Sequence, residues 1–443
     1  MNFKKKSRVV LAGLQLTNVK DFEHKSSMDE LERLVTTLGF ETLERFSQKR
    51  KLPHSGYLFG KGKLKEIAVW TGGPGEVFGF NQDPEDEIDE NGLFYETEKD
   101  ESEMATMVVV DCELTPTQLT NLEQAFGVEV LDRTAVILEI FSRHANTKEA
   151  RLQVEIAKLA YMAPRLRASR VGGDRQGGGI GSKGSGETSH ELDRRRIRDR
   201  IADLRNQLKA IRVEELNRRS HRDEVLLVAL IGYTNAGKSS LMRKLTKTEI
   251  EGENKLFATL GTTIRVLQPE TTPKILVSDT VGFIKKLPHD LVASFRSTLD
   301  EAKAASLLLY VVDGSDANFR SQLDVTREVI AEIGADGNSS KLLINKSDLI
   351  SSEDREEIAK EYPEAIFIST QDAEDVNLVR ELIRSEFEKD MSDEEVFVPY
   401  TSGHIIGKIR SKARVLSESY LDDGTMLLVR AEEDVHNWIK KLL

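Results

Sequence analysis

The stretch GYTNAGKS, from Gly232 to Ser239, combines two glycines with a lysine and a hydroxyl in the order that phosphate-binding loops use. It follows the apolar run Val225–Ile231 and precedes a helical pattern. Glycines let consecutive backbone N–H groups turn toward phosphate oxygens, and the start of a helix adds the positive end of its dipole. Lys238 would reach the β- and γ-phosphates, and Ser239 would be a ligand of Mg²⁺. The predicted nucleotide-binding residues of this loop are Gly232, Tyr233, Thr234, Asn235, Ala236, Gly237, Lys238 and Ser239.

The stretch NKSD, from Asn345 to Asp348, follows the apolar run KLLI and indicates which base the site accepts. A carboxylate at Asp348 can accept hydrogen bonds from both the N1–H and the 2-amino group of guanine, whereas adenine offers no such pair of donors. Asn345 is expected to face the acceptor edge of the base. The stretch IFISTQD supplies two hydroxyls after another strand, suited to closing over the base. The predicted base-binding residues are Asn345, Lys346, Ser347, Asp348, Ser369 and Thr370.

Between these two motifs, the stretch ILVSDTVGF ends in residues that could act at the γ-phosphate. Asp279 closes an apolar strand, as expected of a carboxylate that acts on Mg²⁺ through the metal's own ligands, and Gly282 can offer its amide to the γ-phosphate. Many GTPases carry a glutamine directly after this glycine to orient the attacking water, but Phe283 holds that position here, and a phenyl ring cannot polarise water. Lys238 and Gly282 are therefore the catalytic candidates, no dedicated base is identified, and free turnover is expected to be slow. The residues predicted to line this side of the nucleotide are Asp279, Thr280, Val281 and Gly282.

The stretch LFATLGTTI, which begins at Leu256, offers three threonines to Mg²⁺ and the γ-phosphate. These are Thr259, Thr262 and Thr263. One threonine is enough for the metal, and spacing alone does not choose among the three.

The elements that must position these residues form an α/β P-loop domain, which we expect over residues 223–390. The preceding chain opens with apolar strands that alternate with helical patterns, so a small α/β domain is predicted over residues 1–140. A last small α/β domain is predicted over residues 391–443. The strands and helices predicted in the first domain cover residues 8–16, 26–40, 108–114, 115–127 and 128–132.

Residues 141–222 are predicted to form an antiparallel helical hairpin, with helices over 147–166 and 192–222. In the second helix, apolar residues recur at spacings of three and four, which is one seam of a coiled coil. The seam residues are Ile197, Ile201, Leu204, Leu208 and Ile211. The glycine-rich loop 172–186 joins the two helices. No apolar strand precedes it, so it fails as a phosphate loop, and the arginine-dense helix beside it favours contact with a larger polyanion.

Charge is distributed unevenly along the chain. The net charge is −12, yet residues 141–222 hold 20 lysines and arginines against 10 acidic residues. An insertion at residues 83–103 holds 11 acidic residues and one lysine, and is predicted to be a solvated surface segment. The field near the basic middle segment therefore decides what it attracts.

The sequence also indicates where the protein works. No apolar run reaches about 18 residues, so no membrane span is expected. The one cysteine, Cys112, forms no internal disulfide, which fits a reducing compartment. The expected location is the cytoplasm.

The sequence resembles the HflX family of ribosome-associated GTPases over nearly its whole length. The specific stretches lie outside the nucleotide motifs: LDRTAVILEIFSRHANTKEARLQVEIAKLAYMAPRL, GGIGSKGSGETSHELDRRRIRDRI and LPHDLVASFRSTLDEA. The family's FATLD is similar to FATLG here, so its aspartate is missing, and by that resemblance Thr259 is the switch threonine on Mg²⁺. The resemblance places Phe257, Ala258, Thr259, Leu260 and Gly261 in the nucleotide site.

The resemblance also implies a partner. In this family the N-terminal domain and the helical arm bind the large (50S) ribosomal subunit, and the glycine loop reaches toward the peptidyl-transferase region. The polyanion would be ribosomal RNA, and the implied roles are ribosome rescue, subunit splitting or biogenesis by a monomeric GTPase that the ribosome stimulates. Lys183 stands where the family usually has arginine. The candidate RNA-contact residues are Lys183, Arg194, Arg195, Arg196 and Arg198.

Two alternatives stay open. The expected cofactors are GTP or GDP with Mg²⁺, and K⁺ is a further candidate because Asn235 resembles the asparagine of potassium-activated GTPases; an asparagine that only stabilises the loop is the other interpretation. The alternative function is an RNA-binding scaffold whose GTPase-like domain has little catalytic role.

Overall fold

The computed structural model describes residues 7–77, 104–165, 189–219, 226–248, 257, 263–271, 274–285, 301–389 and 391–443. The chain divides into two compact units. The first comprises Met1–Ile211 with Lys286–Ser294, and the second comprises Arg212–Lys285 with Phe295–Leu443. Among the described residues, no helix is both long and apolar enough to cross a membrane.

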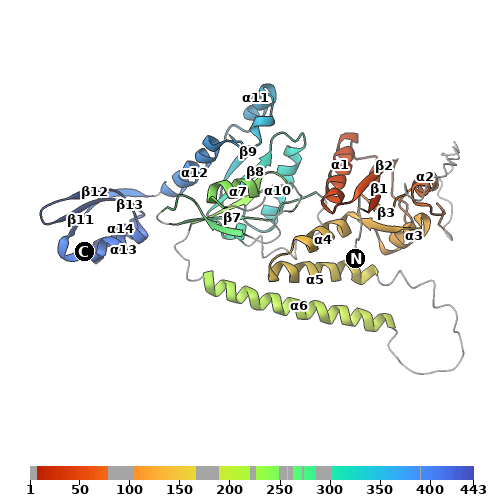
Figure 1. Ribbon diagram of the computed structural model, residues 1–443, viewed down its shortest axis with the longest axis horizontal. Coiled ribbons are helices and arrows are strands. Elements are labelled where there is room, and N and C mark those ends of the chain that lie inside the picture. Colours follow the sequence, from red (N-terminus) through yellow and green to blue (C-terminus); the bar gives the residue numbers. More distant parts are fainter. Residues whose placement is uncertain are drawn as a thin grey trace. The chain divides into compact units, whose positions relative to one another are not determined.

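The first unit opens with a four-stranded parallel sheet in the order β2-β1-β3-β4 (Figure 1). Alternate strand residues face opposite sides of the sheet, so Val10, Ala12, Val108 and Val110 pack on α2 and α3, while α1 and α4 contact each other. The elements are β1 (Arg8–Leu16), α1 (Asp21–Thr37), β2 (Glu41–Arg50), α2 (Lys61–Thr71), β3 (Met107–Val110), α3 (Pro116–Phe126), β4 (Glu129–Asp132) and α4 (Arg133–His144).

Two of these elements differ from the prediction. Helix α1 begins at Asp21, earlier than the predicted start at residue 26. Strand β2 was not predicted at all, because it is a polar edge strand in which only Phe46 and Arg50 are buried, so the apolar alternation that marks a strand is missing. Gly127 ends α3 as predicted, in the left-handed conformation that glycine adopts without strain.

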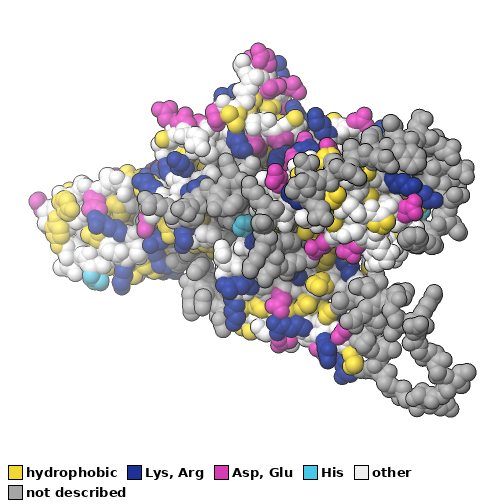
Figure 2. Space-filling view, turned by 45° about the vertical axis from the view of Figure 1, so that its right-hand side comes forward, with side chains coloured by type: hydrophobic (Ala, Val, Ile, Leu, Met, Phe, Trp, Pro, Cys, Tyr) yellow, Lys and Arg dark blue, Asp and Glu magenta, His cyan; other side chains and the backbone are white. Residues whose placement is uncertain are grey.

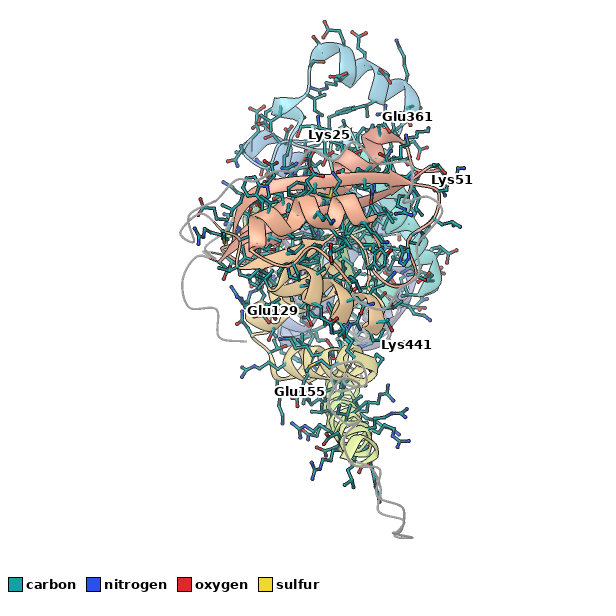
Figure 3. The ribbon with its side chains drawn as sticks, turned by 90° about the vertical axis from the view of Figure 1, so that its right-hand side faces the viewer. Lys25, Lys51, Glu129, Glu155, Glu361 and Lys441 are labelled. Atoms are coloured by element: carbon teal, nitrogen blue, oxygen red, sulfur yellow. The ribbon has the colours of Figure 1, made fainter. Side chains whose placement is uncertain are left out.

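The predicted helical hairpin is formed by α5 (Lys148–Arg165) and α6 (Ser189–Arg219). Leu152 and Ile156 of α5 form a small core with Leu204 of α6, and the other seam residues packed there are Ile201, Leu208 and Ile211. Ile197 lies beyond this core and is half-buried. Across the two helices, Arg200 donates to Glu155 at 2.8 Å. Nitrogen-tipped side chains project from α6 below Glu155 in Figure 3.

The second unit contains a six-stranded sheet in the order β10-β9-β8-β5-β7-β6, parallel except for β6. Helices α7 and α12 pack on one face through Leu241, Leu245 and Val379, and α10 and α11 pack on the other through Phe319 and Ile358. The elements are β5 (Leu226–Ile231), α7 (Lys238–Thr246), β6 (Thr263–Val266), β7 (Ile275–Asp279), β8 (Leu307–Asp313), α10 (Phe319–Glu332), β9 (Ser339–Asn345), α11 (Ser352–Glu361), β10 (Ile366–Phe367) and α12 (Ala373–Glu388).

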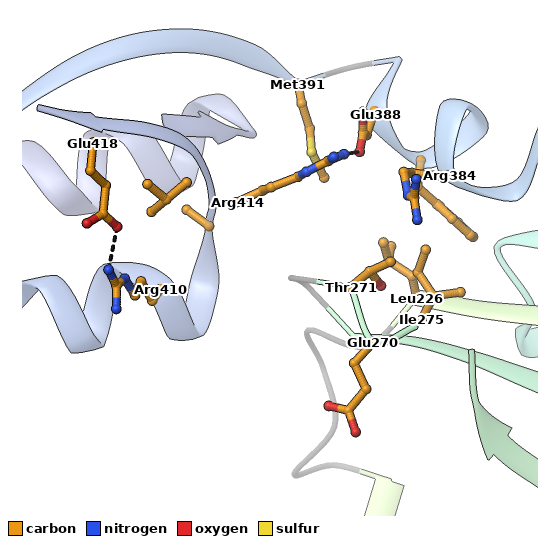
Figure 4. A pocket seen from close by; sticks show the side chains of 13 residues that line it. Leu226, Glu270, Thr271, Ile275, Arg384, Glu388, Met391, Arg410, Arg414 and Glu418 are labelled. Carbon is orange, nitrogen blue, oxygen red and sulfur yellow. Dashed lines mark hydrogen bonds and ion pairs between the residues drawn. The ribbon is translucent and has the colours of Figure 1, made fainter. Parts of the chain in front are cut away.

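A small antiparallel sheet in the order β11-β13-β12 ends the chain, with its own core beneath α13 and α14. Its elements are β11 (Ser392–Pro399), α13 (His404–Lys412), β12 (Arg414–Tyr420), β13 (Gly424–Ala431) and α14 (Glu433–Leu442). Glu388, the last residue of α12, pairs with Arg414 and Arg430 of this sheet. Figure 4 shows Arg414 reaching Glu388 at the wall of a pocket. These ion pairs attach the small domain to α12.

Candidate active site

The phosphate loop connects the buried end of β5 to the start of α7. Gly232 and Gly237 adopt φ values of 151° and 98°, and Asn235 adopts 62°. A Cβ on Gly232 would lie 2.1 Å from the Val311 carbonyl oxygen, and a Cβ on Gly237 would lie 2.1 Å from Nδ2 of Asn345. Both glycines are therefore required by conformation and by space, and the loop exposes the N-terminus of α7 to a ligand.

Lys238 is held in place by the phosphate loop itself. Its Nζ donates to the carbonyl oxygens of Gly232 at 2.9 Å and Tyr233 at 2.7 Å, and the residue is 5% exposed. Burial lowers the pKa of Lys238 to about 8, while Asp279 acts in the opposite direction. An ammonium carries three N–H donors, so two bonds to the loop leave one donor for a phosphate.

Ser239 and Asp279 form the group of oxygens that fits a magnesium ion. Asp279 ends β7, is 1% exposed and accepts a hydrogen bond from the Ser239 hydroxyl at 2.6 Å. Mg²⁺ prefers hard oxygen donors and is held by one or two protein groups together with substrate phosphates. A hydroxyl at the start of α7 and a buried carboxylate at the end of β7 meet that requirement. Thr280 instead donates to the Leu230 carbonyl at 2.8 Å, so it fixes the strand end.

The residues after Asp279 lie against the phosphate loop. A Cβ on Gly282 would lie 2.9 Å from the Thr234 Cα and 3.0 Å from the Lys238 Nζ, so only glycine permits this approach. Phe283 is 3% exposed, and its ring is enclosed by protein. The position where many GTPases present a glutamine to water thus presents a buried phenyl ring. Val281 is also buried.

Asn345 connects two loops of the site. Its side chain is fully buried, donates to the Ala236 carbonyl at 2.8 Å and accepts from the Thr370 N–H at 3.3 Å. Asn345 therefore bridges the phosphate loop and the segment Ser369–Thr370. A side-chain amide has two N–H donors and an oxygen that accepts two bonds, so contact with a base stays a prediction.

Asp348 lies in the short 3-10 helix Ser347–Leu349 and is exposed. Within the described part of the chain its carboxylate forms no hydrogen bond or ion pair. Ser347 donates its N–H to the Ile368 carbonyl at 3.1 Å, which ties this helix to the strand before Ser369. The carboxylate is thus presented at a fixed position with its acceptor capacity intact.

Three supporting carboxylates were missed by the sequence reasoning. Asp313, at the end of β8, pairs with the Lys346 ammonium. Asp375 accepts from the Ser369 N–H at 2.7 Å, and Glu301 accepts from the buried Ser278 hydroxyl at 2.8 Å. The stretch VVDGSD, an acid at the end of an apolar strand, is the sequence signal that could have found Asp313.

Several predicted residues lie outside the described residues. This applies to Ala258, Thr259, Leu260 and Gly261, to Lys183 with the whole glycine loop 172–186, and to the acidic insertion 83–103. Phe257 is described: it is buried and has a φ of 58°. Arg194, Arg195, Arg196 and Arg198 lie on α6; Arg196 pairs with Asp193 at 3.3 Å, and Arg195 also has a partner.

The chain is similar to known GTPases over most of its length. Family models match residues 25–73 and 93–142 (GTP-binding GTPase N-terminal), 144–222 (GTP-binding GTPase Middle Region) and 227–346 (50S ribosome-binding GTPase). The GTPase HflX of Gluconacetobacter diazotrophicus is 51% identical over 95% of this chain and 94% of its own length. The chain belongs to the HflX family of GTPases. It binds guanine nucleotides and hydrolyses GTP.

Two further matches are less similar in sequence. The GTPase HflX of Escherichia coli is 33% identical over 95% of this chain and 92% of its own length. A solved GTP-binding protein from Sulfolobus solfataricus, in complex with GDP, is 23% identical, with a TM-score of 0.41, and the match covers 86% of this chain and 98% of that one. The P-loop α/β fold is as predicted. Because the family is one of GTPases, the alternative of a scaffold without catalysis is set aside.

Proposed function

We propose that this chain is a Mg²⁺-dependent cytoplasmic GTPase that binds the 50S ribosomal subunit through its N-terminal domain and helical arm, and serves ribosome rescue, subunit splitting or biogenesis. The domain limits that we assign are residues 1–140, 141–222, 223–390 and 391–443. The family model over residues 227–346 is described as a 50S ribosome-binding GTPase, which supports this partner.

The observation that carries the proposal is the arginine surface on the first half of α6. Arg194 and Arg198 are exposed, and within the described part of the chain they form no ion pair. In the lower part of Figure 2, dark blue side chains lie among magenta and yellow ones. A helix that buries only a narrow apolar seam and keeps arginines in solvent is suited to RNA phosphates, which it neutralises with release of counterions.

Slow hydrolysis by the free protein is part of this proposal. Phe283 is buried and supplies no polar group, so the attacking water must be oriented by a group from elsewhere. A docked ribosomal subunit would supply it by ordering the chain around the γ-phosphate. K⁺ is a second proposed contributor: Asn235 is exposed on the phosphate loop, where its side-chain oxygen can reach a cation beside the phosphates. Replacing K⁺ by Na⁺ should then lower turnover and leave nucleotide affinity unchanged, whereas equal rates would leave Asn235 with its conformational role alone.

Co-sedimentation with purified 50S subunits tests the partner. The unmodified chain should pellet with 50S in the presence of a non-hydrolysable GTP analogue. The double change Arg194→Ala, Arg198→Ala should weaken binding and reduce the slope of log affinity against log salt by about 2, since each phosphate contact contributes about 1. The matched control, Lys360→Ala with Lys441→Ala, removes two exposed cations outside the arm and should leave the slope unchanged. Absence of co-sedimentation with either GDP or the analogue would refute the proposal.

A further inference from the structure

Three hydrogen bonds join the phosphate loop to the chain that follows Asp279. The Phe283 N–H donates to the Gly232 carbonyl at 3.1 Å, and the Thr234 N–H donates to the Phe283 carbonyl at 2.8 Å. The third is made by a side chain: the Lys285 N–H donates to the Tyr233 hydroxyl oxygen at 2.6 Å. The phosphate loop therefore continues to pair with this segment beyond the end of the sheet.

The pairing is a continuation of the ladder between β5 and β7. That ladder ends where Leu230 lies opposite Asp279, and it resumes as an isolated parallel bridge between Tyr233 and Phe283. The two bonds at this bridge join backbone groups and do not involve the Tyr233 side chain. Among the described residues, the Tyr233 hydroxyl, on a residue that is 3% exposed, extends the pairing by a further two residues to Lys285.

Gly282 lies within this paired segment and takes its position from it. Its Cα lies so close to the Thr234 backbone and the Lys238 amine that an added Cβ would lie 2.9 Å from the Thr234 Cα and 3.0 Å from the Lys238 Nζ. Lys238 is itself anchored on the carbonyls of Gly232 and Tyr233. The groups that we assign to the γ-phosphate, the Lys238 ammonium and the Gly282 amide, are thus held on one framework.

We propose that Tyr233 is a positioning residue for the γ-phosphate. Its hydroxyl holds the Phe283–Lys285 backbone on the phosphate loop, and this keeps Gly282 beside Lys238 instead of letting the chain after Asp279 swing into solvent. The inference rests on the proposed assignment of Lys238 and Gly282 to that phosphate. In this role Tyr233 acts through the backbone that its hydroxyl holds.

The role separates GTP from GDP. Both nucleotides use the phosphate loop and Lys238, but GDP has no γ-phosphate for Gly282 to meet. Loss of the Tyr233 hydroxyl should therefore weaken a GTP analogue by about 2- to 10-fold, the range that one hydrogen bond contributes, and should lower kcat for GTP similarly. GDP affinity should stay the same, so it also reports that the variant is folded.

The experiment is titration of Tyr233→Phe with fluorescent GDP and with the matching non-hydrolysable GTP analogue, alongside steady-state turnover. Tyr310→Phe is the matched control, because Tyr310 is a half-buried tyrosine of the same domain whose hydroxyl forms no hydrogen bond with the described residues. Lys238→Met serves as a third protein, because it should lose affinity for both nucleotides.

The outcomes distinguish the assignment of the phosphate site from the positioning role of Tyr233. If Lys238→Met keeps full affinity for both nucleotides, the assignment of the phosphate site is wrong. If Lys238→Met loses affinity but Tyr233→Phe matches the unmodified protein in both nucleotides, the positioning role alone is overturned. A gain in GTP affinity in Tyr233→Phe would also overturn it, because the hydroxyl would then hold the segment closed against GTP. Equal weakening of GDP and GTP would show a role in folding the loop only.

Discussion

The N-terminal sheet and the GTPase sheet both place charged side chains where their parallel strands end, and the two sets are bonded differently. After β3 and β4, the Arg133 guanidinium is 1% exposed and pairs with Asp111 at 2.7 Å and with Glu30 of α1. After β5, the buried Lys238 ammonium bonds to two backbone carbonyls, and Asp279 bonds to a serine hydroxyl.

The difference shows how a similar edge can serve folding in one domain and binding in another. In the N-terminal set each charge has an opposite charge as its direct partner, so the group is complete without a ligand. In the GTPase set, the hydrogen-bond partners of the Lys238 ammonium among the described residues are two backbone carbonyls, and burial lowers the pKa of this ammonium. A phosphate can therefore form a stronger charge-assisted hydrogen bond with the Lys238 ammonium than with the Arg133 guanidinium.

The largest expected effect is on nucleotide binding when the ammonium is removed. In Lys238→Met, affinity for GTP and GDP should fall by about 10- to 150-fold, because the one charge-assisted bond to phosphate that this ammonium can add contributes about 1.5–3 kcal/mol. The free energy of unfolding of the nucleotide-free protein should fall by no more than about 1–3 kcal/mol, because the lost bonds to Gly232 and Tyr233 are offset by removal of a buried charge. Fluorescent nucleotide titration and chemical denaturation measure the two. If Lys238→Met lost several kcal/mol of stability but kept its nucleotide affinity, Lys238 would serve folding and not phosphate binding.

The same replacement in the N-terminal set should do the opposite. Arg133→Met leaves Asp111 and Glu30 buried without their cation, so unfolding of this domain should cost about 3–5 kcal/mol less. Trp70 is one of two tryptophans, so its fluorescence in a Trp438→Phe background reports this domain alone. GTP affinity should be unchanged. If the Trp70 unfolding transition occurred at the same denaturant concentration with and without Arg133→Met, the stabilising role of these ion pairs would be contradicted.

The smallest expected effect is a pH dependence that belongs to one set only. Burial holds the pKa of Lys238 at about 8 in the free protein, and bound phosphates raise it by favouring the charged form. Above about pH 8, nucleotide binding is therefore accompanied by uptake of a proton on Lys238. Affinity for GTP should be constant below about pH 8 and should fall as the pH rises through it, by at most about tenfold per unit. Arg133→Met should show the same profile, because an arginine does not titrate in this range. Affinity that rises with pH would contradict the assignment to Lys238.

The sequence predicted the elements of the site well, because the motifs combine local conformation with chemistry. The positive φ of Gly232 and Gly237 and the strand-loop-helix order follow from residue types that tolerate few alternatives. The Ile201–Ile211 seam was predicted for the same reason, since a spacing of three and four fits one helix face.

Contacts between segments far apart in the chain could not be predicted in this way. Asn345 meets Ala236 across 109 positions, and Arg133 meets Glu30 across 103. Nothing local in either segment specifies such a partner. The polar edge strand β2 was missed because its stability comes from pairing with β1 and only slightly from its own side chains.

Steady-state GTP turnover with and without 50S subunits, at matched potassium and magnesium, tests the central claim most directly. The claim has two parts. The site holds the groups that bind the phosphates but no group that orients the attacking water, because Phe283 is buried at that position. The ribosome supplies the missing group. Saturating 50S should raise turnover on the order of 100-fold or more, the scale of well-placed electrostatic groups in such sites. Turnover that stays the same at saturating 50S would contradict the account.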